Sequence, residues 1–149
     1  TDVSNGTLTF ANCPDPVPVN KANTSVPTLH SYAATMYDLN VSVGNKVVHT
    51  NVPGVEDISI TDRERTGSIT IRDVLIATKD FPTIVRNATT GGLSVQHGQT
   101  ATNIFEVTCT DAQLKSPKYG DVDMTITTGF DLRLQRTAKA NSAIKLTCR

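Results

Sequence analysis

The feature that most constrains this chain is an alternation of apolar and polar side chains with a period of two residues. Successive side chains of a β-strand point to opposite faces, so this period predicts strands with one buried face and one polar face. Clusters of Gly, Asn and Asp separate the alternating segments, which favours an antiparallel sandwich or barrel-like sheet of many short strands. The alternating segments are residues 37–43, 58–60, 69–71, 105–109, 130–134 and 144–148.

Two hairpins are predicted in the first half of the chain. The strand at 37–43 is followed by a Gly-Asn pair, and residues 46–50 are expected to return antiparallel to it. Residues 58–60 and 69–71 are expected to form the second hairpin, because the charged segment 62–65 and a glycine lie between them. In this arrangement, residues 62–65 form an exposed turn at a hairpin tip.

One segment departs from the two-residue period. Asp80 is placed to cap a helix, Pro82 falls in the first turn, where proline is tolerated, and two glycines follow at 91–92. These signals predict one short helix at about 80–88 that flanks the sheet. Its apolar face would consist of Phe81, Ile84, Val85 and Ala88.

The stretch from residue 12 to residue 31 is rich in proline, which cannot donate a hydrogen bond to the neighbour of a central strand. It is therefore expected to run over the surface as a long extended segment. Its apolar side chains are costly to leave in water without a partner, so they predict a contact between subunits. These side chains are Val17, Val19, Val26 and Leu29.

Length and charge narrow the class of protein. A chain of 149 residues suits one domain, 1–149, with one sizeable core. The 14 Lys and Arg residues balance the 14 Asp and Glu residues, so net charge predicts neither binding in a nucleic-acid groove nor attraction to a membrane surface. No apolar run approaches the roughly 18 residues that a membrane span needs.

No motif in the sequence predicts catalysis or metal binding. The three histidines are far apart, no Gly-x-Ser-x-Gly elbow surrounds a serine, and no Cys-x-x-Cys pair is present. We therefore predict no catalytic residue, no metal site and no cofactor. Cys109 and Cys148 share the phase of their apolar neighbours and are expected to be buried and reduced, whereas Cys13 should be more accessible.

The order of several segments resembles the tail tube, or major tail, proteins of long-tailed bacteriophages. The shared signals are a strand that ends in Gly-Asn, a DR…TGS hairpin, an HG.T..N connection, the segment LKSPKYGD and a long strand with LRL. The resemblance covers about residues 28–149 and implies that His97 lies in a structural turn at a strand end. Thr102 stands where such proteins often carry glycine. Over 1–27 the Pro-rich segment looks like the linker of longer members, so the chain is expected to be one domain or the C-terminal part of a longer protein.

The resemblance implies a structural virion protein with a tail-tube fold, an antiparallel β-sandwich with a flanking helix. Such proteins assemble into stacked rings around a channel that conducts DNA during ejection, and they are not enzymes. The implied partners are further copies of the chain, other tail proteins and DNA that passes without specific binding, with no membrane. The implied location is the virion tail, after assembly in the host cytoplasm. Tubes of contractile systems share the implied fold.

Strand edges, the 12–31 segment and the charged segment 62–65 are the expected contacts between subunits. Four alternating charges can set the register between stacked rings without adding much affinity. These charges are Asp62, Arg63, Glu64 and Arg65.

The channel lining should not retain DNA, because each phosphate that Lys or Arg binds adds a favourable release of counterions. We therefore expect acidic or neutral strand faces to line it, with Lys and Arg mostly at strand ends and turns. The candidates are Asp38, Asn40, Asp57, Ser59, Ser68, Thr70, Glu106, Thr108, Thr125 and Thr127.

An extracellular adhesin or carbohydrate-binding sandwich is the main alternative. It predicts a secretion signal, paired cysteines and an exposed aromatic platform, whereas this chain has three cysteines and no tryptophan. A β-sandwich hydrolase is a third possibility that would need paired carboxylates in a motif, and none stands out.

Overall fold

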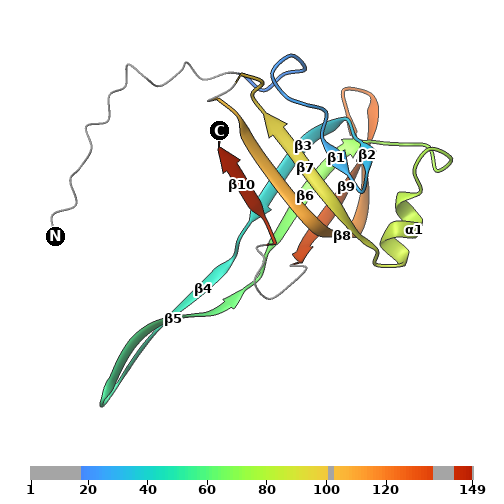
Figure 1. Ribbon diagram of the computed structural model, residues 1–149. Coiled ribbons are helices and arrows are strands. Elements are labelled where there is room, and N and C mark those ends of the chain that lie inside the picture. Colours follow the sequence, from blue (N-terminus) through green and yellow to red (C-terminus); the bar gives the residue numbers. More distant parts are fainter. Residues whose placement is uncertain (1–17, 101–102, 136–142, 149) are drawn as a thin grey trace.

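Figure 1 shows the computed structural model, which describes residues 18–100, 103–135 and 143–148, without the side chain of Arg63. Within these ranges the chain forms ten strands and one helix. In chain order they are β1 (Thr28–Leu29), β2 (Tyr32–Ala33), β3 (Met36–Ser42), β4 (Asn45–Val52), β5 (Val55–Arg63), β6 (Thr66–Arg72), α1 (Phe81–Arg86), β7 (Thr90–His97), β8 (Phe105–Val122), β9 (Thr125–Gln135) and β10 (Lys145–Cys148).

Eight of these strands form one antiparallel sheet in the order β2-β1-β7-β8-β9-β6-β3, with β10 paired to β8. The first half of β8 pairs with β7 and its second half pairs with β9, so this long strand bends from one half of the sheet to the other. Over the described residues the curved sheet does not close into a barrel (Figure 1). The predicted mainly-β, antiparallel, sandwich-like fold with one short helix is therefore confirmed.

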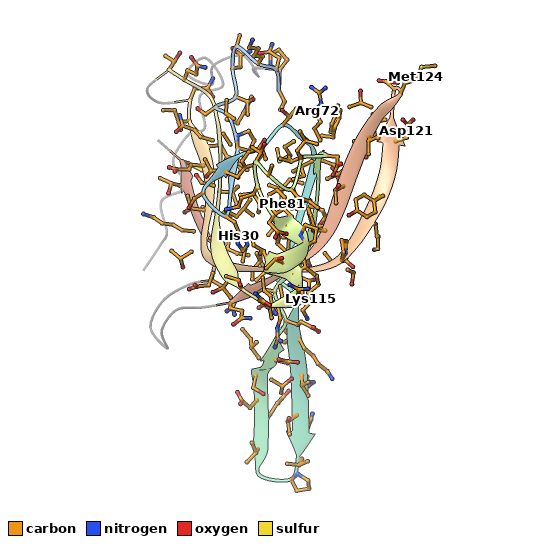
Figure 2. The ribbon with its side chains drawn as sticks, turned by 90° about the vertical axis from the view of Figure 1, so that its right-hand side faces the viewer. His30, Arg72, Phe81, Lys115, Asp121 and Met124 are labelled. Atoms are coloured by element: carbon orange, nitrogen blue, oxygen red, sulfur yellow. The ribbon has the colours of Figure 1, made fainter. Side chains whose placement is uncertain are left out.

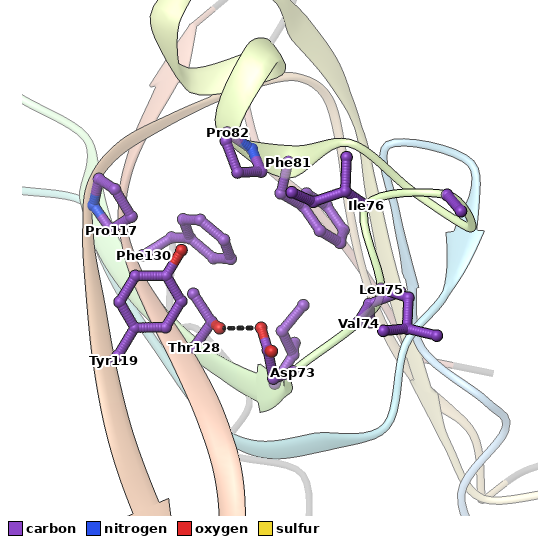
Figure 3. A pocket seen from close by; sticks show the side chains of 12 residues that line it. Asp73, Val74, Leu75, Ile76, Phe81, Pro82, Pro117, Tyr119, Thr128 and Phe130 are labelled. Carbon is purple, nitrogen blue, oxygen red and sulfur yellow. Dashed lines mark hydrogen bonds between the residues drawn. The ribbon is translucent and has the colours of Figure 1, made fainter.

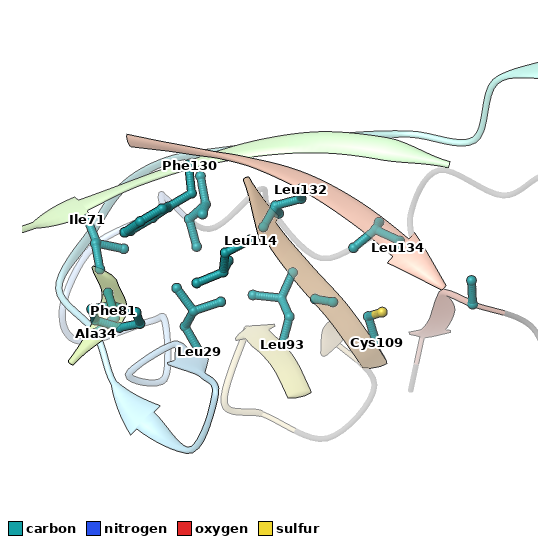
Figure 4. Packing of buried hydrophobic residues seen from close by; sticks show 13 residues of the cluster. Leu29, Ala34, Ile71, Phe81, Leu93, Cys109, Leu114, Phe130, Leu132 and Leu134 are labelled. Atoms are coloured by element: carbon teal, nitrogen blue, oxygen red, sulfur yellow. The ribbon is translucent and has the colours of Figure 1, made fainter. Parts of the chain in front are cut away.

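The core lies between the two halves of the curved sheet. Side chains from β6 and β9 meet side chains from β1, β7 and β8 there (Figure 4). Leu29, Ile69, Leu93 and Leu114 are each no more than 1% exposed. Burying a side chain of this size contributes about 1.5–3 kcal/mol.

The helix predicted at 80–88 is present as α1. The Oδ1 of Asp80 accepts a hydrogen bond from the backbone N–H of Thr83 at 2.8 Å, and hydrogen bonds from Thr83 lower the pKa of this carboxyl. The ring of Phe81 lies 6.0 Å from that of Tyr32 and 5.5 Å from that of Phe130. Because these two rings belong to β2 and β9, Phe81 ties the helix to both halves of the sheet.

Both hairpins predicted for the first half of the chain are wrong. β3 pairs with β6 rather than with the residues that follow it, and the other edge of β6 pairs with β9. Residues 45–63 leave the sheet and form a ribbon of their own, in which β4 pairs with β5. Its turn is Pro53-Gly54, where Gly54 has a φ of 93°, as the third residue of a type II turn requires. The turn therefore forms at Pro53-Gly54 and not at the charged segment 62–65.

We call residues 45–63 the arm and the other described residues the body. The arm extends from the ends of β3 and β6 away from the body, and the β8–β9 turn lies at the opposite end of the molecule (Figures 1 and 2). Its described side chains are exposed, except for Val48 and Ser59, which are half-buried.

The Pro-rich segment predicted to run over the surface enters the sheet at its C-terminal end. Val17 lies outside the described residues, whereas Val19 and Val26 are 76% and 67% exposed. Leu29 is in β1 opposite Leu93 and is fully buried, so the prediction that it contacts another subunit is wrong. The prolines of this segment end at Pro27, which leaves the next two residues able to pair as a strand.

His30 joins β1 to the neighbouring strands from inside the body. Its Nε2 donates a hydrogen bond to the carbonyl of Ala112 at 2.9 Å, and its own carbonyl accepts one from Lys79 Nζ at 2.7 Å. Its ring lies against Gly91, where an added Cβ would come within 2.5 Å of His30 Nδ1. Burial lowers the pKa of His30 from its ordinary 6.5; the Ala112 hydrogen bond acts in the opposite direction, and the Lys79 charge lowers the pKa further.

Candidate functional site

The arm has an apolar face that no part of the described structure covers. Cross-strand partners share a face of a ribbon, and Val47 lies opposite Ile60, while Ile58 lies opposite His49. Val47 is 59%, Ile58 70% and Ile60 47% exposed, and we call these three residues the arm face. A two-stranded ribbon on its own is only marginally stable in water. The arm face is therefore a surface that needs a partner.

The outer part of the arm is also acidic. Between residues 47 and 61 the sequence contains Glu56 and Asp57 but no Lys or Arg. His49 Nε2 lies 3.2 Å from Glu56 Oε1, and both side chains are exposed. A surface that receives the arm should therefore be apolar and carry positive charge.

The charged segment 62–65 lies at the base of the arm, which corrects its predicted place at a hairpin tip. Asp62 and Arg63 end β5, and Glu64 and Arg65 connect it to β6. The backbone N–H of Glu64 donates to the carbonyl of Gly44 at 3.2 Å, which closes the base of the ribbon. These charges therefore flank the junction between arm and body, and the side chain of Arg63 is outside the described structure.

Polar side chains form rows across β3, β6, β9 and β8 on the sheet face that points away from the core. The rows are Asp38, Thr70, Gly129 and Lys118; Asn40, Ser68, Asp131 and Lys115; and Ser42, Thr66, Arg133 and Gln113. We call these three rows the polar face. Lys118 Nζ lies 3.2 Å from both carboxylate oxygens of Asp131.

The polar face brings together four predicted channel residues, namely Asp38, Asn40, Ser68 and Thr70. It also contains three cations within strands, so the prediction that Lys and Arg lie mostly at strand ends and turns is wrong here. The face has two carboxylates and three cations, a mixed rather than an acidic surface.

The remaining channel candidates lie outside the three rows of the polar face, although Thr125 and Thr127 share its side of β9. Asp57 and Ser59 alternate with Ile58 and lie on the opposite side of the arm, and Glu106 and Thr108 lie on β8 where it pairs with both β7 and β10. Thr125 begins β9. Thr127 is only 3% exposed, which leaves little of its side chain to line a channel.

Two apolar grooves open on the body. The distal groove, of about 440 Å³, lies between the loop after β6, the start of α1 and the β8–β9 hairpin (Figure 3). Its lining includes Leu75, Ile76 and Tyr119. Its one charged residue is Asp73, whose Oδ1 accepts a hydrogen bond from Thr128 Oγ1 at 2.6 Å.

The N-terminal groove, of about 580 Å³, lies between residues 19–27 and the start of β3. Its apolar lining residues include Val19, Val26, Met36 and Tyr37, and its one charged residue is Lys21. The distal groove joins segments that are distant in the sequence, so no local pattern could have predicted it, whereas the N-terminal groove lies within residues 19–37.

The two described cysteines have different surroundings. Cys109 is buried as predicted, and burial raises the pKa of its thiol. Cys148 is exposed, so its predicted burial is wrong. It has the expected phase, opposite Phe105, but Phe105 is itself 45% exposed, so this end of the sheet is open within the described residues. Cys13 lies outside the described residues.

His97 lies at the end of β7, which confirms its predicted place at a strand end. Its Nδ1 is 3.0 Å from Thr24 Oγ1. Gly98 follows with a φ of 88°, and a Cβ there would lie 1.8 Å from the carbonyl oxygen of Asn103. The glycine is therefore required by a close approach of two backbone segments.

The described side chains form no recognisable metal site, and the sequence matches no protein-family model. Among the described residues, no three His, Cys, Asp or Glu side chains are grouped so that they could hold a metal ion. The part of the chain that the structure describes also has no helix long and apolar enough to cross a membrane. No protein-family model and no curated protein matches the sequence significantly.

Proposed function

We propose that this chain is a tail tube protein, a structural virion protein that forms stacked rings in the tail of a long-tailed bacteriophage. The observation that carries the proposal is the arm, an exposed ribbon that has one apolar face and extends beyond the body. A contact between an arm at one end of a subunit and a surface at its other end repeats without closing, and this builds a column. The sandwich-like body with one short helix fits the fold that the sequence resemblance implies.

Sheet edges supply the lateral contacts of a ring. Over the described residues β3 pairs only with β6, and β10 pairs only with β8. Each therefore has an edge whose backbone groups can pair with a neighbouring subunit. Pairing of this kind continues the sheet from subunit to subunit and turns the polar face toward the channel.

The charges of the polar face suit a channel that conducts DNA without holding it. Two carboxylates offset two of its three cations, and one of these pairs is the contact between Lys118 and Asp131. The excess is one positive charge per subunit, so this lining should hold DNA far less than the three cations would alone, and salt should weaken the remaining attraction.

Electron microscopy of the purified 149-residue chain tests the proposal. The wild-type protein should form rings and columns, and Ile58→Asp should give rings that do not stack. Val52→Asp is the matched control, because it replaces a half-exposed apolar residue with the same charge on the other side of the arm, opposite Val55, and should stack normally. A wild-type protein that stays monomeric at high concentration, or that binds a glycan as a monomer, would reject the tail tube in favour of a binding module.

A further inference from the structure

The arm and the N-terminal groove lie at opposite ends of the same strand. The groove includes Met36 and Tyr37 at the start of β3, and the arm leaves the body after Ser42 at its end. Strand rise places these ends roughly 20 Å apart. The arm extends away from the body (Figure 1), so the groove it could enter belongs to another copy.

The two surfaces are complementary in charge and character. The outer arm carries Glu56 and Asp57 without Lys or Arg, whereas Lys21 is the one charged residue that lines the N-terminal groove. The arm face is apolar, and so are the exposed groove residues Val19 and Val26. The distal groove is also apolar, but its charged residue is Asp73, which repels an acidic arm.

The N-terminal groove also borders a strand edge. Over the described residues β3 pairs on one side only, and its first residues form one wall of the groove. An extended segment that enters such a groove can add to the edge through backbone hydrogen bonds while its side chains fill the apolar space. The arm consists of two extended strands and presents its own outer edges for this purpose.

We infer that the N-terminal groove is the receptor for the arm of a second copy of this chain. The inference rests on the proposed function, because it names the contact by which one ring stacks on the next. Each subunit then offers an arm at one end and a receptor at the other, and every stacking contact is the same.

Paired single substitutions of exposed side chains test this contact in the full chain. Val26→Asp places a carboxylate in the groove and leaves the arm of the same subunit intact. Ile58→Asp places a carboxylate on the arm face and leaves the groove intact. Each variant alone should form single-layer rings. Mixed in equal amounts they should form stacks of two layers and no longer columns, because the arms of the first fit only the grooves of the second.

Leu75→Asp is the matched control, since Leu75 is 78% exposed and lines the distal groove. It should form columns as long as those of the wild type. A charge exchange gives a second measurement: Lys21→Glu should shorten columns, and adding Glu56→Lys, on the same side of the arm as Ile58, should restore them. Thermal melting of each variant verifies that the body remains folded.

Three outcomes would overturn the inference. These are normal columns from Val26→Asp, mixtures without two-layer stacks, and loss of stacking in Leu75→Asp. If the wild type forms single-file chains instead of stacked rings, the proposed function fails, and sedimentation of the mixed variants still decides the contact. A one-to-one complex of Val26→Asp with Ile58→Asp supports the contact, and the absence of any complex rejects it.

Discussion

The body and the arm are both built from antiparallel strands with apolar side chains on alternate positions, yet those side chains have different surroundings. In the body, Leu114 is 1% exposed between two halves of a curved sheet. In the arm, Ile58 is 70% exposed on a ribbon that has only one layer. The same local pattern therefore supports the fold in one region and leaves a surface for assembly in the other. An alternating pattern predicts that one face of a strand is apolar. It does not predict whether that face packs against the same chain or against another one.

The largest expected difference between the two regions is in the cost of removing an apolar side chain. Leu114→Ala should lower the free energy of unfolding by about 2–5 kcal/mol, because it leaves a cavity in the core. Ile58→Ala should change it by less than about 0.5 kcal/mol, because Ile58 has no cover in the single chain. Chemical denaturation at a concentration where the chain is monomeric measures both. A large loss in Ile58→Ala would show that the arm packs onto its own body.

Replacing a glycine with alanine in each region should affect stability differently. A Cβ at Gly91 would come within 2.5 Å of the His30 ring, so Gly91→Ala should cost about 1–3 kcal/mol of stability by overpacking. Gly54 has nothing within 4 Å of the Cβ position but has a φ of 93°. Gly54→Ala should therefore strain only the turn of the arm and leave the unfolding midpoint of the body unchanged. Equal shifts in the two variants would contradict the independence of arm and body.

The buried histidine of the body, His30, should link stability to pH. Burial lowers the pKa of His30, so the unfolded chain binds this proton before the folded chain does as the pH falls. His30 therefore supports folding above its ordinary value of 6.5, and this stability is lost as the pH falls through the lower folded pKa. Unfolding free energies measured between about pH 7.5 and pH 5 should show the decline. His30→Gln should flatten it, whereas His49→Gln in the arm should keep it.

Thiol labelling extends the comparison within the body. Cys109 lies in the packed core and should react slowly under native conditions, because burial raises its pKa and blocks access. Cys148 is exposed on β10 and should react quickly. If assembly pairs the edge of β10 with a neighbour, labelling of Cys148 should slow in rings relative to monomers. Fast labelling of Cys109 would mean that the core opens readily.

The sequence predicts a local element well where its residues are compatible with only one structure. Asp80, Pro82 and the glycines after the helix place α1 within two residues, because capping acts over a single turn. The strand pairing fails where two turn signals compete, since Pro53-Gly54 forms the tip and residues 62–65 do not. The apolar residues on both sides of Pro53-Gly54 could have revealed the arm.

Burial and surfaces depend on contacts between distant residues, and these are harder to predict from a sequence. Cys148 has the expected phase but is exposed together with its partner Phe105, and Thr127 is only 3% exposed on the side of β9 that faces away from the core. The N-terminal groove combines two segments, 19–27 and 34–37, which the β1–β2 hairpin brings together, although neither of its two-residue strands has a clear strand pattern in the sequence. The candidate site was therefore only partly predictable from the sequence.

The smallest expected effect on stability comes from the polar face, where the consequence should appear in DNA binding instead. Ser68 and Thr70 are half-buried on the side of the sheet away from the core, so replacing both with Lys should change the free energy of unfolding by only about 0.5 kcal/mol each. If this face lines the channel, each ring gains cations that release counterions from DNA, and this gain is summed over many rings. Columns of the double variant should then retain DNA in co-sedimentation at low salt and release it as salt is added, and particles that carry them should eject DNA slowly. Thr78→Lys, in the exposed loop after β6, supplies a matched charge away from this face and should leave DNA mobile. Retention by Thr78→Lys but not by the double variant would place the polar face on the outside of the tube.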